Sequence, residues 1–298
     1  MKPIKVLLLL IVLLNFTTLF GVKEIIKYDR LTLYYDKADL PLAEMIGEQL
    51  PLIIDNFQQT IGVYPEFKAK IYLSHDREDF QSRVDLFGGI TEFSNAFYSK
   101  RDNYIYIKSY FEIGDRDTFL RILLHEYIHA FIDYHFKDAP LWFHEGMAIY
   151  FAQQYSTQMT VNLGMDYLAG NVKELAQMED YYPMQSHNLS SFYAKSALAV
   201  KMLHQKDSGA FSMLFVSVKR FDSAFFRSYK KSKTKFYSEF EKKFKAKMYF
   251  SVVYALFTFV WILLPILMFF GWIKQSRKRE EQIEAMESDE ENEGVRLV

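Results

Sequence analysis

The sequence predicts an α+β fold, with a small mixed sheet in the N-terminal part, a central helix that carries candidate metal ligands, a helical C-terminal part and one C-terminal transmembrane helix. Three observations lead to this prediction. Short β-rich runs lie before residue 110, helical periodicity dominates after it, and an uncharged run covers 248–273. The residues in between, 22–247, are enough for one domain with a sizeable core.

The first elements are strands and a helix. Residues 31–35 form a short β-rich run, and residues 68–73 alternate between apolar and polar side chains as a strand does. Between them, 38–61 has helical periodicity, which we expect Pro41 and Pro51 to interrupt. This order predicts two strands of the sheet with a helical connection.

A hairpin should follow. Residues 93–99 and 104–109 are aromatic and β-branched, and the polar segment 100–103 joins them as a turn. The first strand of this hairpin is expected to lie at the edge of the sheet, where an extended peptide can pair with its backbone.

The next segment predicts a buried helix. Asp115 and Asp117 are candidates for the N-terminal cap, and residues 119–132 are apolar on almost every side. His125, Glu126 and His129 lie inside this segment. Buried imidazole and carboxylate groups are costly unless they are satisfied, and a divalent cation satisfies them.

The spacing of these residues favours zinc. Residues four apart share one face of a helix, so His125 and His129 can bind the same ion. A catalytic zinc site usually has a third protein ligand and leaves one position for water, and Glu145 is the candidate. It follows the helix break at 137–140, early in a second predicted helix. Glu126 would be the general base for the metal-bound water, not a ligand.

The motif His125-Glu126-Tyr127-Ile128-His129, with Glu145 inside Trp142-Phe143-His144-Glu145-Gly146-Met147-Ala148, resembles the gluzincin zinc metallopeptidases, in particular the bacterial group with a peptidase MA-like domain. The resemblance implies a thermolysin-like minimal catalytic domain and one zinc ion, bound by His125, His129 and Glu145. It also implies hydrolysis of peptide bonds with Glu126 as general base. The short gap before Glu145 favours the compact group over thermolysin or the large aminopeptidases, and it leaves open whether the enzyme is an endopeptidase or an aminopeptidase.

One position departs from this family. Ile149 stands where thermolysin-type enzymes have an acid that orients a zinc histidine, so that support must come from elsewhere, for example from a backbone carbonyl.

Two further sites rest on the same resemblance. Asn95 and Ala96 open a stretch similar to the edge strand that binds substrate in thermolysin, although an ordinary hairpin strand explains the residues equally well. Tyr193 is the candidate for stabilising the oxyanion, with His187 and His204 as alternatives.

Both chain ends are apolar. Residues 1–21 combine two lysines with an aliphatic centre and predict a signal peptide or an uncleaved N-terminal anchor. Residues 248–273 predict a transmembrane helix that contacts membrane lipid, and 274–298 a charged cytoplasmic tail. The chain would then be a single-pass membrane protein with its catalytic domain outside the cytoplasm, periplasmic or extracellular.

Composition narrows the functions. The absence of cysteine excludes disulfides and thiolate ligands, and a net charge of −1 argues against a nucleic-acid partner. The basic segment 219–247 carries no nucleic-acid motif. Charges on both sides of the histidine pair argue against an intramembrane protease. Two readings remain: a membrane-anchored zinc metallopeptidase acting on a peptide or protein, and a catalytically inactive binding or scaffold module of the same fold.

Overall fold

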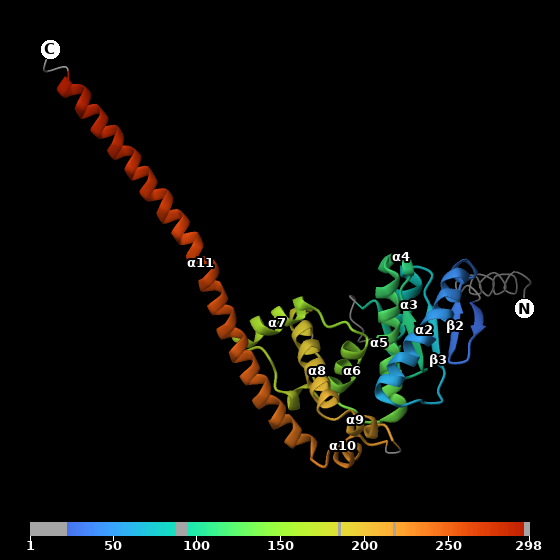
Figure 1. Ribbon diagram of the computed structural model, residues 1–298. Helices are drawn as coiled ribbons and strands as arrows, with labels where there is room; N and C mark the ends of the chain where they lie inside the picture. Colours follow the sequence, from blue (N-terminus) through green and yellow to red (C-terminus); the bar gives the residue numbers. More distant parts are fainter. Residues whose placement is uncertain (1–22, 88–93, 184–185, 217–218, 295–298) are drawn as a thin grey trace, which may run out of the picture. The chain divides into compact units, whose positions relative to one another are not determined.

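The fold is described from a computed structural model, which covers residues 23–87, 94–183, 186–216 and 219–294 (Figure 1). The predicted signal segment 1–21 lies outside these residues. The chain divides into two compact units, Met1–Glu241 and Lys242–Val298. The metal-binding candidates all belong to the first unit.

A five-stranded mixed sheet occupies the N-terminal part of the first unit, with the strand order β1-β2-β3-β5-β4. The central strands β2, β3 and β5 run parallel, whereas β1 and β4 pair antiparallel with their neighbours. Strand β4 therefore forms one edge of the sheet, as predicted for the hairpin. The strands are β1 (Glu24–Lys27), β2 (Leu31–Tyr35), β3 (Ala69–Leu73), β4 (Ala96–Ser99) and β5 (Tyr104–Ile107).

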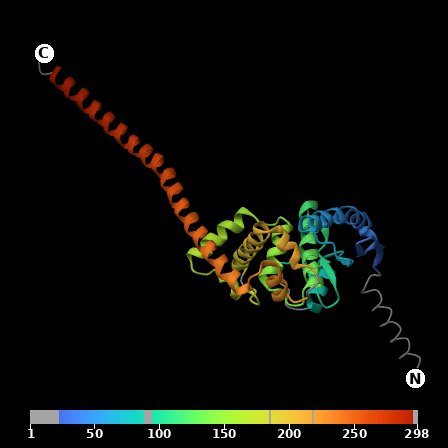
Figure 2. The ribbon, with the colours of Figure 1, turned by 60° about the horizontal axis from the view of Figure 1, so that its bottom comes forward.

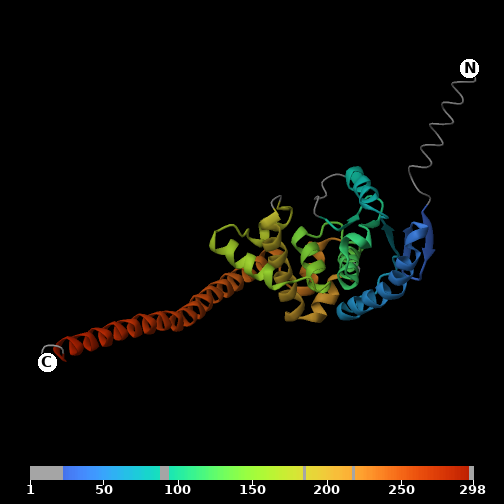
Figure 3. The same cartoon turned by 90° about the horizontal axis from the view of Figure 1, so that it is seen from above.

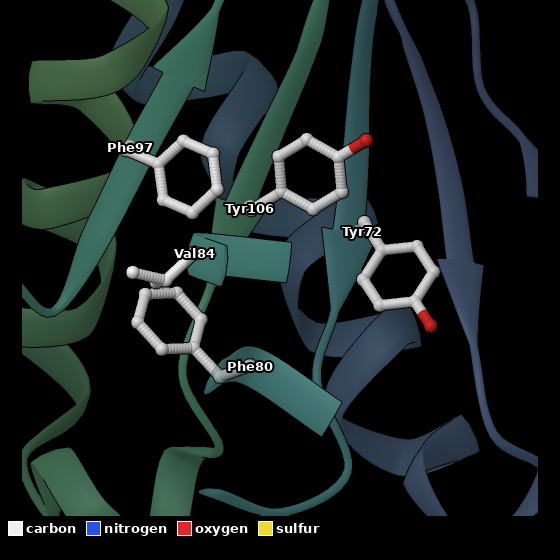
Figure 4. Close-up of a cluster of buried hydrophobic side chains, with 5 residues drawn as sticks. All are labelled: Tyr72, Phe80, Val84, Phe97 and Tyr106. Carbon is white, nitrogen blue, oxygen red and sulfur yellow. The ribbon is translucent and has the colours of Figure 1, made fainter. Parts of the chain in front are cut away.

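Helices cover both faces of this sheet. Successive side chains of a strand point to opposite faces, so each face contributes side chains to a buried layer. On one face, Phe80 and Val84 of α3 (Arg77–Phe87) pack on aromatic residues of three strands: Tyr72, Phe97 and Tyr106 (Figure 4). The opposite face contacts α2 (Leu40–Ile61) and α5 (Arg116–His135). Figure 3 shows α2 and α3 on opposite sides of the sheet. Helix α5 is thus held against β4 and β5.

The rest of the first unit is helical. Figures 1 and 2 show these helices on the side of α5 that faces away from the sheet. They are α6 (Leu141–Phe151), α7 (Thr157–Leu168), α8 (Ser186–Lys206), α9 (Ser208–Leu214), α10 (Phe221–Tyr229) and the start of α11 (Lys233–Gly294). Short helical turns are η1 (Lys37–Asp39), α4 (Tyr110–Ile113) and η2 (Leu175–Met178).

Helices α6 and α8 approach each other very closely at Gly146. A Cβ atom built on Gly146 would lie 2.4 Å from the backbone oxygen of Ser196, closer than real Cβ contacts occur. Only glycine fits without movement of one backbone. Gly146 therefore allows α6 to pack closely against α8. Because Glu145 precedes this glycine, the same contact positions its carboxylate.

The structure corrects the predicted fold class. The chain is mostly helical with one small mixed sheet. Proline does not interrupt the first long helix: Pro41 lies in its first turn, where no hydrogen bond is lost, and Pro51 lies inside the continuous α2.

The membrane prediction is also wrong. The apolar run 248–273 does not form an element of its own but is the middle of the 62-residue helix α11, which has charged segments on both sides. Throughout the part of the chain that the structure describes, no helix is long and apolar enough to span a bilayer. The transmembrane helix, the cytoplasmic tail after it and the single-pass location therefore have no support.

Candidate metal centre

The predicted buried helix α5 is confirmed, and it holds three of the candidate residues. Its N-terminus is capped by Asp115, whose carboxylate accepts a hydrogen bond of 2.8 Å from the backbone N–H of Thr118. Large apolar residues are buried on nearly every side of this helix: Phe119, Leu120, Leu123, Leu124, Tyr127, Ile128, Phe131 and Ile132. Its polar residues are therefore held in a rigid, largely dehydrated setting.

His125, His129 and Glu145 converge on one point. The two imidazole rings are 4.8 Å apart between centroids, as the spacing of four residues on a helix predicts. The Oε2 atom of Glu145, from α6, lies 3.7 Å from Nε2 of His125 and 3.8 Å from Nε2 of His129. The structure thus joins two helices at the three ligands that the sequence predicts.

The Glu145 carboxylate is the strongest sign that a cation belongs here. Only 7% of the residue is exposed, and its Oε2 atom has no hydrogen-bond partner. Tetrahedral zinc with bonds of about 2.0–2.2 Å separates its ligand atoms by roughly 3.3–3.5 Å, close to the two distances above. Two nitrogen donors and one carboxylate oxygen fit zinc with a fourth position left for water.

The pKa values of His125, His129 and Glu145 are shifted because the three side chains are buried next to one another. Burial opposes charge on His125, but the facing carboxylates of Glu145 and Glu126 raise its pKa. Burial dominates at His129 and lowers its pKa to about 3. Burial likewise opposes charge on Glu145, yet the two histidines hold its pKa below the usual value. An ionised carboxylate and a neutral His129 are the forms that bind a metal.

Glu126 lies beside these ligands and points into the same site. It is 8% exposed, and burial, followed by the nearby charge of Glu145, raises its pKa to about 7. The backbone N–H of Tyr98 in β4 donates a hydrogen bond to its carboxylate. A carboxylate with a pKa near neutrality can take up and release a proton at physiological pH, as a general base must.

The residue that orients His125 is Gln154, which sequence reasoning missed. Its Oε1 atom lies 2.8 Å from Nδ1 of His125, and its Nε2 atom donates to the backbone oxygen of Arg121 at 3.3 Å. An acceptor at Nδ1 places the proton on that nitrogen and leaves Nε2 free for a metal. A side-chain amide thus provides the support that Ile149 does not give.

An open cleft of about 650 Å³ is lined by the three candidate ligands and Glu126. Its lining also includes Ala96 and Tyr98 of β4 and further residues of α5 and α6. Asn95 lies just before β4 and is exposed, and its backbone oxygen accepts a hydrogen bond from Lys108. Of the two predicted substrate contacts, Ala96 therefore lines the cleft, whereas Asn95 is not among its lining residues.

Tyr193 and Tyr182 also line the cleft. Their hydroxyl oxygens are 2.5 Å apart. Burial and the facing Glu145 carboxylate raise the pKa of both, to about 12 for Tyr182, so both hydroxyls keep their protons near neutral pH. Of the alternatives to Tyr193, His204 lines a different pocket beside Tyr150, and the side chain of His187 lies outside the described residues.

A second group of possible ligands, Asp36, Asp39 and His75, gathers beside the N-terminal strands. Here the ammonium of Lys23 already lies 2.6 Å from Asp36 and 2.8 Å from Asp79. A lysine ammonium thus already pairs with one carboxylate of this group, and Nδ1 of His75 lies 3.0 Å from Oδ2 of Asp39. Among the described residues, the ion partners of Glu145 are the two histidines, and no lysine or arginine pairs with it.

No protein-family model matches this chain, and no curated protein is similar to it.

Proposed function

We propose that this protein is a zinc-dependent peptidase of the gluzincin type, in which His125, His129 and Glu145 hold one zinc ion and Glu126 is the general base. The observation that carries the proposal is the buried Glu145 oxygen, which has no hydrogen-bond partner and faces both Nε2 atoms. A metal would satisfy all three groups at once. The open cleft beside them gives a substrate access to this site.

The chemistry divides among a few residues. A zinc ion held by His125, His129 and Glu145 would supply a water with a pKa near 7 and would polarise the carbonyl group of the substrate. Glu126 accepts the proton of the attacking water and passes it to the leaving amine. Its pKa of about 7 in the metal-free protein suits both transfers.

The oxyanion that develops on the substrate needs a hydrogen-bond donor as well. Tyr193 is the candidate, because its hydroxyl lines the cleft and keeps its proton. Tyr182, hydrogen bonded to it at 2.5 Å, would orient that hydroxyl. A donor fixed before the reaction stabilises the transition state without reorganisation.

The edge strand β4 suits an extended substrate. Among the described strands it pairs with β5 alone, and its Ala96 and Tyr98 line the cleft. Backbone groups of an extended peptide can pair with such an edge whatever the side chains are. A peptide is therefore the substrate class that the cleft fits best.

Glu126→Gln is the decisive variant. We expect the full-length protein to bind about one zinc per chain, and Glu126→Gln to keep the metal but lose hydrolysis of a mixed peptide library by at least about a thousandfold. His129→Ala should lose the metal itself. Asp117→Asn, on the exposed first turn of the same helix, is the control and should change neither property.

The result also separates the competing function. If the wild-type protein binds zinc tightly but cleaves no peptide in the library, the inactive binding module is the better description. If neither the wild-type protein nor the control binds zinc, both readings fail.

A further inference from the structure

A carboxylate lies one helical turn beyond the metal ligands. Asp133 follows His129 by four residues on α5 and so shares the face that carries both histidines. Its side chain is 11% exposed and lines the cleft. The ion partner nearest to it is Lys100, whose Nζ atom lies 2.6 Å from Oδ1.

Lys100 contacts this carboxylate from the surface of the protein. It belongs to the turn after β4, and its side chain is 62% exposed. Holding such an exposed lysine side chain in one geometry costs side-chain entropy, which weakens the ion pair. Asp133 itself is fixed in a buried helix. A positively charged group that enters the cleft can therefore displace the lysine or share the carboxylate with it.

The other charged residues that line the cleft also favour a cationic ligand. Apart from Glu126 and Glu145, its lining carries Asp133, Glu179 and Asp180, and Lys100 is the one lysine or arginine among the described lining residues. Glu179 is paired with Lys233, at 2.9 Å. Acidic surroundings favour cations and disfavour acidic segments.

The distance along the helix sets where such a cation would bind. Four residues of an α-helix rise about 6 Å, and an extended peptide covers that length in about two residues. A group bound at Asp133 would therefore belong to the substrate residue about two positions from the bond that is cleaved.

We propose that Asp133 is a specificity-determining residue, which binds an organic cation of the substrate about two residues from the scissile bond while Lys100 gives way. The cation is a lysine or arginine side chain or the amino terminus of the peptide. This inference rests on the proposed peptidase function, because it assumes that the cleft binds peptides.

The test measures binding separately from hydrolysis. Zinc-loaded Glu126→Gln protein is titrated calorimetrically with peptides in which lysine or glutamine occupies each position in turn, each made with a free and with an acetylated amino terminus. We expect lysine at one position, or the free terminus, to bind about tenfold more tightly. Adding Asp133→Asn should abolish this preference. Adding Lys100→Gln should strengthen binding of the cationic peptides by a few fold.

Asp117→Asn in the same background is the control and should leave the preference unchanged. Circular dichroism and zinc content show whether Asp133→Asn stays folded and loaded. If it misfolds, the Lys100→Glu variant tests the same idea, because a new acid beside Asp133 should strengthen the preference for lysine.

The two proposals fail in different ways. If the wild-type protein hydrolyses peptides but the preference does not depend on Asp133, the specificity inference is wrong and the peptidase stands. If Asp133 controls peptide binding but the wild-type protein hydrolyses nothing, the peptidase is wrong and the cation site stands. A free-terminus effect without a lysine effect assigns the site to the amino terminus.

Discussion

The hydrogen bond from His125 to Gln154 makes a sharp prediction about metal affinity. Gln154→Leu keeps a similar volume but removes the acceptor that lies 2.8 Å from Nδ1. His125 is then free to rotate or to carry its proton on Nε2, the nitrogen that faces Glu145. Loss of such a partner typically weakens metal binding by about 10- to 100-fold, or about 1.4–2.7 kcal/mol.

The assay is competition for zinc against a chelator of known affinity, followed by circular dichroism to verify the fold. Gln154→Glu should bind zinc at least as tightly as the wild-type protein, because a carboxylate is the stronger acceptor for Nδ1–H. The control is Gln158→Leu, which removes an exposed glutamine whose amide donates a hydrogen bond to Asn162 on α7. A zinc affinity of Gln154→Leu within twofold of the wild-type value would refute the assigned role of this hydrogen bond.

Three further predictions concern packing, pH and the oxyanion. Gly146→Ala should lower the free energy of unfolding by about 2–3 kcal/mol, because its Cβ would lie 2.4 Å from the Ser196 oxygen. The control Gly164→Ala, which has open space around it, should be neutral or stabilising. Equal denaturation midpoints for the two variants would contradict this prediction. Burial lowers the pKa of His135 to about 4 in the folded protein, below its usual value of about 6.5. Its neutral form therefore stabilises the fold above pH 6.5, and this contribution is lost as the pH falls towards 4. Between pH 6.5 and 4, the free energy of unfolding of the wild-type protein should fall by about 2 kcal/mol more than that of His135→Gln, allowing for partial exposure. Parallel curves of stability against pH for the two proteins would contradict this prediction. Tyr193→Phe should keep zinc and KM but lower kcat about a hundredfold or more; unchanged kcat would remove it from the mechanism.

Local patterns predicted the elements that hold the site. The cap at Asp115, the apolar surroundings of His125 and His129 and the helix break before Glu145 are signals carried by neighbouring residues. The hairpin was predicted in the same way, because its aromatic strands flank a polar turn.

Tertiary contacts were beyond such patterns. Gln154 reaches His125 because Gln153 turns the chain in the left-handed region, with φ of 55°, a conformation that a non-glycine residue rarely adopts and that the sequence does not signal. Tyr182 comes from an irregular segment and meets Tyr193 only through folding. Two local signals were also misleading. Helix α2 continues through Pro51, and α11 continues through the apolar run 248–273, although the sequence predicted an interruption at the first and a separate element at the second.

The most direct test of the metal centre is a crystal structure of the zinc-soaked protein with anomalous data collected on both sides of the zinc absorption edge. We predict one strong anomalous peak about 2.0–2.2 Å from Nε2 of His125, Nε2 of His129 and an oxygen of Glu145. A peak at Asp36, Asp39 and His75 alone, or none near Glu145, would contradict the account.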